Sequence, residues 1–104
     1  MEIKFFDQNI EDFIDSLEKT THAKTLRILD LLEKYGSNLS LPYSKKIGRR
    51  LFELRIYGKQ KVRIIYTFYK NQVVLLHSFI KKSQRITKRD LDLAKKKLFY
   101  LDSL

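Results

Sequence analysis

Apolar and polar residues alternate most clearly between Leu51 and Lys82, and this pattern predicts three β-strands. The first run, Phe52–Tyr57, and the second, Lys61–Phe68, both alternate, whereas the third, Val73–Ile80, is apolar at nearly every position. Alternation is typical of a strand with one buried and one solvent-exposed face, and a continuous apolar run indicates burial on both faces. We therefore predict a three-stranded antiparallel meander with a buried last strand.

The phase of the pattern places three charged residues on the exposed face of this meander. Glu53 and Arg55 are out of phase with the apolar residues of the first run, and Arg63 is out of phase with those of the second. A hairpin turn at residues 58–60 brings Arg55 and Arg63 close together. Two like charges opposite each other cost up to about 1 kcal/mol. The pair is tolerable if Glu53 lies between the arginines or if a phosphate is the intended occupant.

The N-terminal third of the chain has helical periodicity. Residues 3–6 predict a short first strand of about four residues. From Asn9, which we expect to be an N-cap, apolar residues recur at helical spacing up to Leu17. A second helix is predicted from Thr21 to Tyr35, with Gly36 as its C-terminal stop. The two helices are expected to form an antiparallel hairpin that serves core packing rather than chemistry.

A loop and a last helix complete the predicted α+β architecture. Residues 37–44, which include the sole proline, predict a loop, and four cations lead from it into the sheet: Lys45, Lys46, Arg49 and Arg50. These cations are either a solvated edge or the first phosphate contacts. Thr87 is expected to cap a C-terminal helix, with Asp90 at the capping-box position. The apolar stripe of that helix consists of Leu91, Ala94, Leu98 and Leu101.

Charge is distributed unevenly along the chain. The 104 residues predict one domain, 1–104, with a net charge of +10. Residues 1–34 hold five Lys/Arg against eight Asp/Glu, whereas residues 35–104 hold seventeen against four. A basic surplus confined to the sheet and the last helix favours a polyanion-binding surface. A lysine-rich solubilising surface is the alternative, and it explains the charge but not its asymmetry.

Several classes of function are disfavoured by composition. There is no cysteine, which excludes disulfides and thiolate metal ligands. The acidic N-terminus does not resemble a signal peptide, and no apolar run approaches the roughly 20 residues of a membrane span. We expect a cytoplasmic protein with no membrane association. With only His22 and His77 present, no acidic cluster and no Gly-rich loop, we expect no metal and no cofactor.

The predicted cationic group suits metal-independent cleavage of RNA. It comprises Glu53, Arg55 and Arg63 of the sheet, together with Lys81, Lys82 and Arg85 at the exit of the last strand. The phase of the strand does not decide whether Lys81 or Lys82 lies on the same face as the arginines. In such a reaction the 2′-OH of the substrate is the nucleophile, so the protein supplies acid–base groups and cations for the pentavalent phosphate. An internal ion pair with Glu53 is the alternative role for the arginines.

Two other polar side chains have simpler interpretations. His77 lies within an apolar strand, so a buried histidine with a satisfied hydrogen bond is favoured over a catalytic one. Tyr66 is in phase with Ile64 and Phe68 and is expected in the core.

Several sequence segments together resemble the RelE/ParE toxin superfamily and, within it, the HigB-like phage-derived toxins. The matching strings are FELRIYG, VRIIYTF and VVLLHSFIKKSQRITKRDLDLAKKKL, and the similarity covers roughly residues 45–101. The hallmarks are Glu53–Arg55, Arg63–Tyr66, Phe79–Lys82 with Gln84, and Ala94–Lys95. The resemblance implies a RelE-like fold, with an N-terminal helical hairpin packed on a mainly antiparallel small twisted sheet and a C-terminal helix.

The resemblance also implies a function and a set of site residues. It implies a type II toxin that enters the ribosomal A site and cleaves mRNA as a metal-independent endoribonuclease. By position, Arg63 matches the arginine that contacts the scissile phosphate, Arg55 and Glu53 lie one strand earlier, and Lys81 and Lys82 match a basic pair. The remaining cations expected to bind RNA are Lys45, Lys46, Arg49, Arg50, Lys61 and Arg85. The acid and base stay open, with His77 and Tyr100 as candidates.

The resemblance implies two partners: the ribosome with its mRNA, and a HigA-like helix-turn-helix antitoxin. Operator DNA would be bound only through that antitoxin. Two other functions fit a similar sequence: a ParE-like inhibitor of DNA gyrase and a non-catalytic RNA-binding module. A gyrase inhibitor has no need for a phosphate cage, and the retained cations Arg55, Arg63, Lys81 and Lys82 therefore argue against it.

Overall fold

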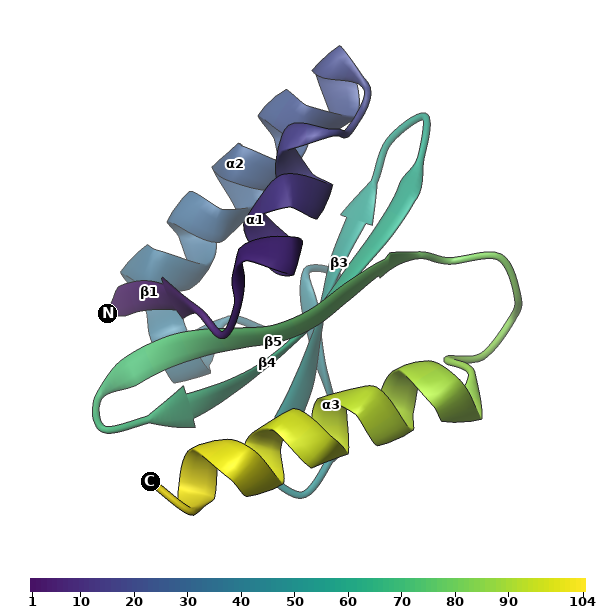
Figure 1. The fold of residues 1–104 in the computed structure, drawn as a ribbon. Helices are drawn as coiled ribbons and strands as arrows, with labels where there is room; N and C mark the ends of the chain where they lie inside the picture. The colour runs from purple at the N-terminus through teal and green to yellow at the C-terminus, as the bar shows by residue number, and fades with distance from the viewer.

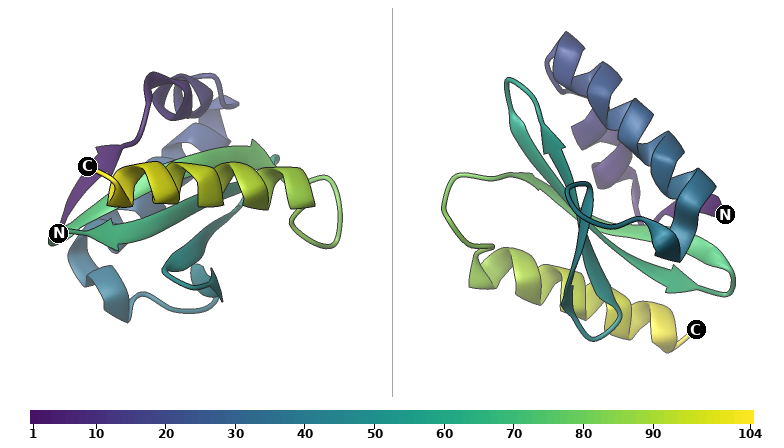
Figure 2. Two further views of the ribbon diagram at one scale, coloured as in Figure 1. Left: turned by 60° about the horizontal axis from the view of Figure 1, so that its bottom comes forward. Right: turned by 180° about the vertical axis from the view of Figure 1, so that it is seen from behind.

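A twisted five-stranded sheet lies between two helices on one face and a single helix on the other (Figure 1; Figure 2). This arrangement comes from a computed structural model that describes residues 1–104. The elements in chain order are β1 (Glu2–Phe5), α1 (Gln8–Asp15), α2 (Lys19–Tyr35), the 3-10 helix η1 (Gly36–Asn38), β2 (Ser44–Gly48), β3 (Leu51–Tyr57), β4 (Lys61–Tyr69), β5 (Gln72–Ile80) and α3 (Lys88–Asp102). The α+β class is therefore confirmed.

The sheet has the strand order β1-β5-β4-β3-β2. Strands β3, β4 and β5 form the predicted antiparallel meander, with the first hairpin turning between Tyr57 and Lys61 as expected. Two strands enlarge it. β1 pairs with β5 in parallel at one edge, and β2 pairs with β3 antiparallel at the other. Residues 45–48, which were expected to lead into the sheet, are thus part of it as strand β2, and β2 also includes Ser44, the last residue of the predicted loop.

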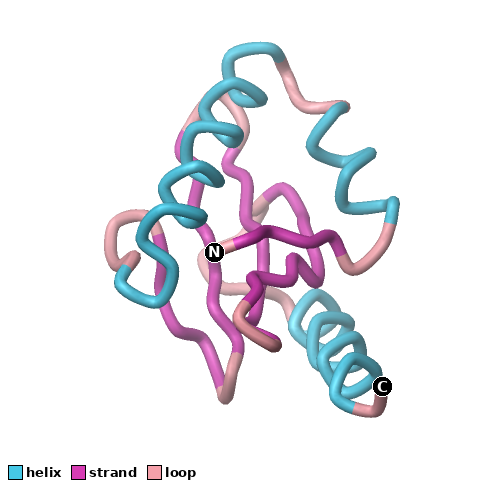
Figure 3. The backbone as a smooth tube through the Cα atoms, turned by 90° about the vertical axis from the view of Figure 1, so that its left-hand side faces the viewer, coloured by secondary structure: helices cyan, strands magenta, loops and turns pink.

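Helices α1 and α2 run in roughly opposite directions over one face of the sheet, as predicted, but both begin earlier than expected (Figure 1; Figure 3). The N-cap of α1 is Asp7, which has an extended backbone and whose side-chain carboxylate accepts the amide N–H of Ile10, so Asn9 lies inside the first turn. The N-cap of α2 is Glu18, whose carboxylate accepts the amides and hydroxyls of Thr20 and Thr21. These four hydrogen bonds lower the pKa of Glu18 to about 2.

Two apolar cores lie on opposite faces of the sheet. The first joins α1 and α2 to the side chains that alternate along β3, β4 and β5: Leu54, Ile56, Val62, Ile64, Tyr66, Val73 and Leu75. The second lies under α3 and comprises Leu51, Ile65, Val74, Leu76, Ala94 and Leu101. Strand β5 contributes to both cores, as the continuous apolar run predicts, and Tyr66 lies in the first core as expected.

The exposed face predicted for the second strand is largely covered. Ile65 and Thr67, on the face opposite to the first core, are fully buried, because α3 packs across β4 and β5. Thr87 caps this helix and its hydroxyl accepts the amide of Asp90, as predicted. The expected stripe faces the sheet, with Ala94 and Leu101 buried and Leu91 and Leu98 partly so. None of the helices combines the length and apolarity needed to cross a bilayer.

Candidate nucleic-acid interface

Arg55 and Arg63 are directly paired residues of β3 and β4, and the carboxylate of Glu53 lies between them. The Nε atom of Arg55 donates to Oε1 of Glu53 at 2.9 Å, and Nε of Arg63 lies 3.8 Å from the same oxygen. The sequence left an ion pair and a phosphate site as alternatives for these arginines. The ion pair is formed, and it offsets the repulsion between the two cations.

Glu53 and Arg63 are not on an open face, which corrects the expectation drawn from strand phase. The Arg63 side chain is only 2% exposed and that of Glu53 is 7% exposed, whereas Arg55 remains 21% exposed. One terminal nitrogen of Arg63 donates to the carbonyl of Val62 at 3.0 Å, and its guanidinium carbon lies 4.9 Å from the centre of the Tyr57 ring. Tyr57, on the same face, covers a cation that phase alone had placed in solvent.

Burial leaves Arg63 with an unusual electrostatic environment. Its Nε atom is buried and has no hydrogen-bond partner, so the guanidinium depends on Glu53 for compensation at 3.8 Å. Arg55 is held more tightly: its hydrogen bond to Glu53 raises the pKa of its guanidinium above the ordinary value, against the opposing effect of burial. Arg55 is therefore a fixed, fully ionised group that still reaches solvent.

A hollow of about 420 Å³, here called the Glu53 hollow, brings six of the predicted site residues together. Its predicted residues are Lys45, Lys46, Glu53, Arg55, Lys81 and Arg85, joined by Ile47, Gln84 and Ile86. These side chains come from β2, β3 and the segment between β5 and α3. Strand β2, which the sequence did not predict, supplies Lys45 and Lys46. The single carboxylate of this hollow is already paired with Arg55, which leaves a net positive site.

A second hollow of about 360 Å³, here called the Lys61 hollow, adjoins the first. It is lined only by polar residues: Lys61, Lys81, Lys82, Ser83 and Gln84. Lys81 and Gln84 belong to both hollows, and the amide of Lys81 donates to the carbonyl of Lys61 at 2.7 Å. Strand register thus assigns Lys81 to the face of Arg63, while Lys82 contributes only to the Lys61 hollow.

Arg49 and Arg50 do not join this surface. They line a separate groove between the β2–β3 turn and α3, together with Leu51, Leu98 and Phe99 among others. Arg50 forms an ion pair with Asp102 at 2.6 Å, which ties the turn to the end of α3. The two arginines were grouped with Lys45 and Lys46 in the sequence, but the lysines lie in β2 and line the Glu53 hollow, whereas the arginines lie in the following turn and line the groove beside α3.

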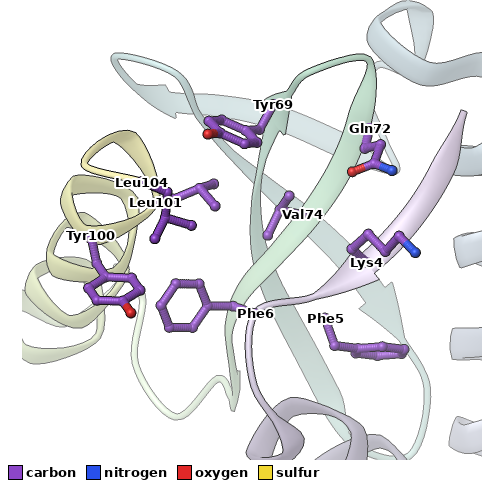
Figure 4. Close-up of a pocket in the computed structure, with 9 residues that line it drawn as sticks. All are labelled: Lys4, Phe5, Phe6, Tyr69, Gln72, Val74, Tyr100, Leu101 and Leu104. Atoms are coloured by element: carbon purple, nitrogen blue, oxygen red, sulfur yellow. The ribbon is translucent and has the colours of Figure 1, made fainter.

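The two candidates for acid or base also lie elsewhere. Nε2 of His77 is 2.8 Å from Oδ1 of Asp90, which gives the partly buried histidine a hydrogen bond, as its apolar strand predicted. Burial alone would raise the pKa of Asp90, but hydrogen bonds from His77 and Thr87 lower it below the ordinary value. Tyr100 lies at the β1 edge of the sheet, where its ring meets Phe6 edge-on at 5.8 Å (Figure 4).

Three residues at this surface received no role from the sequence: Tyr57, Ser83 and Gln84. For Tyr57 the signal was present, because it shares the phase of Glu53 and Arg55 in an alternating strand. Gln84 was noted as a hallmark only, and its place between the two hollows depends on the path of the segment after β5. No local pattern predicts that path.

Fold and surface together define a small α+β domain with a cationic surface where β2, β3 and the segment after β5 meet. The chain matches the family described as Phage derived protein Gp49-like (DUF891) over residues 12–98 and therefore belongs to it. This is a family of toxin-like proteins of the RelE/HigB type. A comparison with curated proteins finds no match to this chain.

Proposed function

We propose that this protein is the toxin of a type II toxin–antitoxin pair and acts as a ribosome-dependent mRNA endonuclease. The observation that carries the proposal is the pair of adjoining cationic hollows that share Lys81, with Arg55 lining the Glu53 hollow and held there by Glu53. Successive phosphates of one RNA strand fit such a surface, because each hollow offers several N–H donors and little competing negative charge.

The proposed chemistry is attack of the substrate 2′-OH on the adjacent phosphorus. A bond forms between the 2′ oxygen and phosphorus as the 2′-OH proton passes to water, and the bond from phosphorus to the 5′ oxygen breaks as that oxygen takes a proton from water. The products are a 2′,3′-cyclic phosphate and a 5′-hydroxyl. Arg55 and Lys81 stabilise the extra negative charge of the pentavalent phosphate. Glu53 holds the Arg55 fork in place, and Arg63 is a positioning residue beneath it.

Induction of the wild type and of Arg55→Gln and Lys81→Gln variants tests the proposal, with Lys34→Gln, an exposed lysine in the last turn of α2, as the control. The nuclease predicts growth arrest with transcript cleavage inside coding regions, abolished in both site variants and retained in the control. Cleavage by purified protein should require translating ribosomes. Arrest with intact mRNA and inhibited supercoiling would instead establish a gyrase inhibitor, and salt-sensitive RNA binding without arrest would establish a binding module.

We further propose a HigA-like helix-turn-helix antitoxin as the partner, since the family is toxin-like and a toxin requires a cognate inhibitor. A short helix-turn-helix reading frame beside the gene, whose co-expression abolishes the arrest, is the expected result. Co-expression that leaves the arrest intact would contradict the assignment of that partner.

A further inference from the structure

Tyr57 presents an aromatic ring beside the cationic surface. It is the last residue of β3, lies on the face of Glu53 and Arg55, and is 46% exposed. Its paired residue on β4 is Lys61, which lines the Lys61 hollow, and two residues before it stands Arg55, which lines the Glu53 hollow. Tyr57 itself lines neither hollow, but on its face of the sheet it is the neighbour of one lining residue of each.

A buried cation packs against the Tyr57 ring. The guanidinium of Arg63 lies 4.9 Å from the ring centre, and that guanidinium is itself fixed by the Val62 carbonyl and by Glu53. A cation packed against one aromatic face is an attractive contact and limits the rotation of the ring. Since the Arg63 side chain is 2% exposed, the solvent-accessible area of Tyr57 lies on its remaining face and edges.

Such a ring is suited to stacking against a planar, uncharged group. An RNA strand that places phosphates in both hollows carries its bases next to them, and every base has a face that stacks on an aromatic side chain. Among the other aromatic residues that are at least 40% exposed, Phe5, Tyr35, Phe99 and Tyr100 lie on β1, α2 and α3, which contribute no residue to either hollow. Tyr43 directly precedes β2, and its carbonyl accepts the amide of Arg55 at 2.8 Å. Tyr57 differs from Tyr43 in that a buried guanidinium packs against its ring and that its neighbours Arg55 and Lys61 line one hollow each.

We propose that Tyr57 is a stacking platform for one nucleobase of the single-stranded RNA whose flanking phosphates occupy the two cationic hollows, with the buried Arg63 guanidinium as its backing. The inference rests on the proposed function only in taking RNA as the ligand. It adds a subsite for a nucleobase to a surface that otherwise contacts only the phosphates of the RNA. Stacking is tolerant of sequence, so the subsite holds the strand in register rather than selecting one base.

The test uses a short 2′-O-methyl RNA that cannot be cleaved, because it lacks the nucleophilic hydroxyl, with 2-aminopurine at successive positions. Wild-type protein at about 50 mM salt should quench the fluorescence at one position. Tyr57→Leu should weaken binding roughly tenfold and abolish that quenching, and Tyr57→Phe should retain both. Tyr35→Leu is the matched control, since Tyr35 is 47% exposed but lies on α2, and it should bind as the wild type does.

An oligonucleotide with an abasic residue at the quenched position separates stacking from a structural role. Wild type and Tyr57→Leu should bind this abasic oligonucleotide equally. If Tyr57→Leu instead lowers the affinity for the abasic and the complete oligonucleotide by the same factor, the proposal is overturned. Wild-type binding without quenching at any position would overturn it too, even if Tyr57→Leu failed to fold. If Arg55→Gln weakens binding and Tyr57→Leu does not, the subsite is refuted while the nuclease proposal stands. The nuclease proposal fails separately, when translating ribosomes show no mRNA cleavage.

Discussion

Arg55 and Arg63 occupy directly opposed positions on β3 and β4, yet Arg55 is 21% exposed and Arg63 is only 2% exposed. Both depend on the same oxygen of Glu53. One arginine is therefore available to a ligand, and the other supports the structure around it. Glu53 connects these two roles, since its removal would leave a buried cation without compensation.

Substitution of that shared carboxylate should be costly for stability. Glu53→Gln leaves the Arg63 guanidinium buried and unpaired, and we expect a loss of about 3 kcal/mol in the free energy of unfolding. Urea denaturation gives the value, and Glu33→Gln, an exposed glutamate whose carboxylate has no ion pair, should change it little. Adding Arg63→Met should restore part of the loss, because it removes the orphaned charge. A variant as stable as the wild type would contradict the shared role of Glu53.

Lys81 should dominate the salt dependence of RNA binding, because it borders both hollows. Each phosphate contact removed lowers the slope of log affinity against log salt by about 0.7 for a single strand. We expect Lys81→Gln to lower the slope by at least this amount and Lys34→Gln, in the last turn of α2, to leave it unchanged. Fluorescence anisotropy at several salt concentrations measures it. Equal slopes for the wild type and Lys81→Gln would remove this lysine from the interface.

The Asp90 carboxylate should contribute pH-dependent stability to the start of α3. Its folded-state pKa lies below the ordinary 3.8, so the stabilisation is complete above that value and is lost as pH falls through the lowered folded-state pKa. Asp90→Asn should cost about 1 kcal/mol above about pH 5 and progressively less in acid. Urea unfolding across this range measures the difference. Asp92→Asn, an exposed position of the same helix with no ion pair, should be neutral throughout.

The spacing of apolar residues predicted most of the fold, because it reflects which side of each helix or strand is buried. The alternation of residues 52–57 and the stripe of Leu91, Ala94, Leu98 and Leu101 both reflect the core faces that form. Strand β2 was missed because its segment, SKKIG, contains two lysines and a glycine and is held in place by β3. The parallel pairing of β1 with β5 could not be predicted from local patterns either, since it joins residues about 70 positions apart in the sequence.

The candidate site was predictable in composition but not in exposure or register. Phase brought Arg55 and Arg63 together, but the packing of Tyr57 over Arg63 is a tertiary contact with no signature in the alternation. The choice of Lys81 over Lys82 depends on an irregularity: Ile65 pairs with His77 while Tyr66 pairs with Leu75, which leaves an extra residue in β5. That residue shifts the phase of the strand end and moves Lys81 onto the face of Arg63.

The position of Tyr100 excludes it from the chemistry proposed for the two hollows. Its ring packs on Phe6 beside β1, whereas the Glu53 hollow is built on β2 and β3, and the strand order places β1 and β2 at opposite edges of the sheet. Tyr100→Phe should therefore retain ribosome-dependent cleavage within about twofold, since loss of a true general acid costs about 10²–10⁴-fold.

Arg55→Lys is the informative comparison for Tyr100→Phe, because it keeps the charge and loses the planar fork that Glu53 orients. We expect cleavage by Arg55→Lys to fall by at least about tenfold, with thermal unfolding confirming that both variants are folded. A loss of about 100-fold in Tyr100→Phe, at the level expected for an acid catalyst, would place the reaction at the β1 edge instead. Retained activity in Tyr100→Phe together with loss in Arg55→Lys would locate it at the hollows that share Lys81.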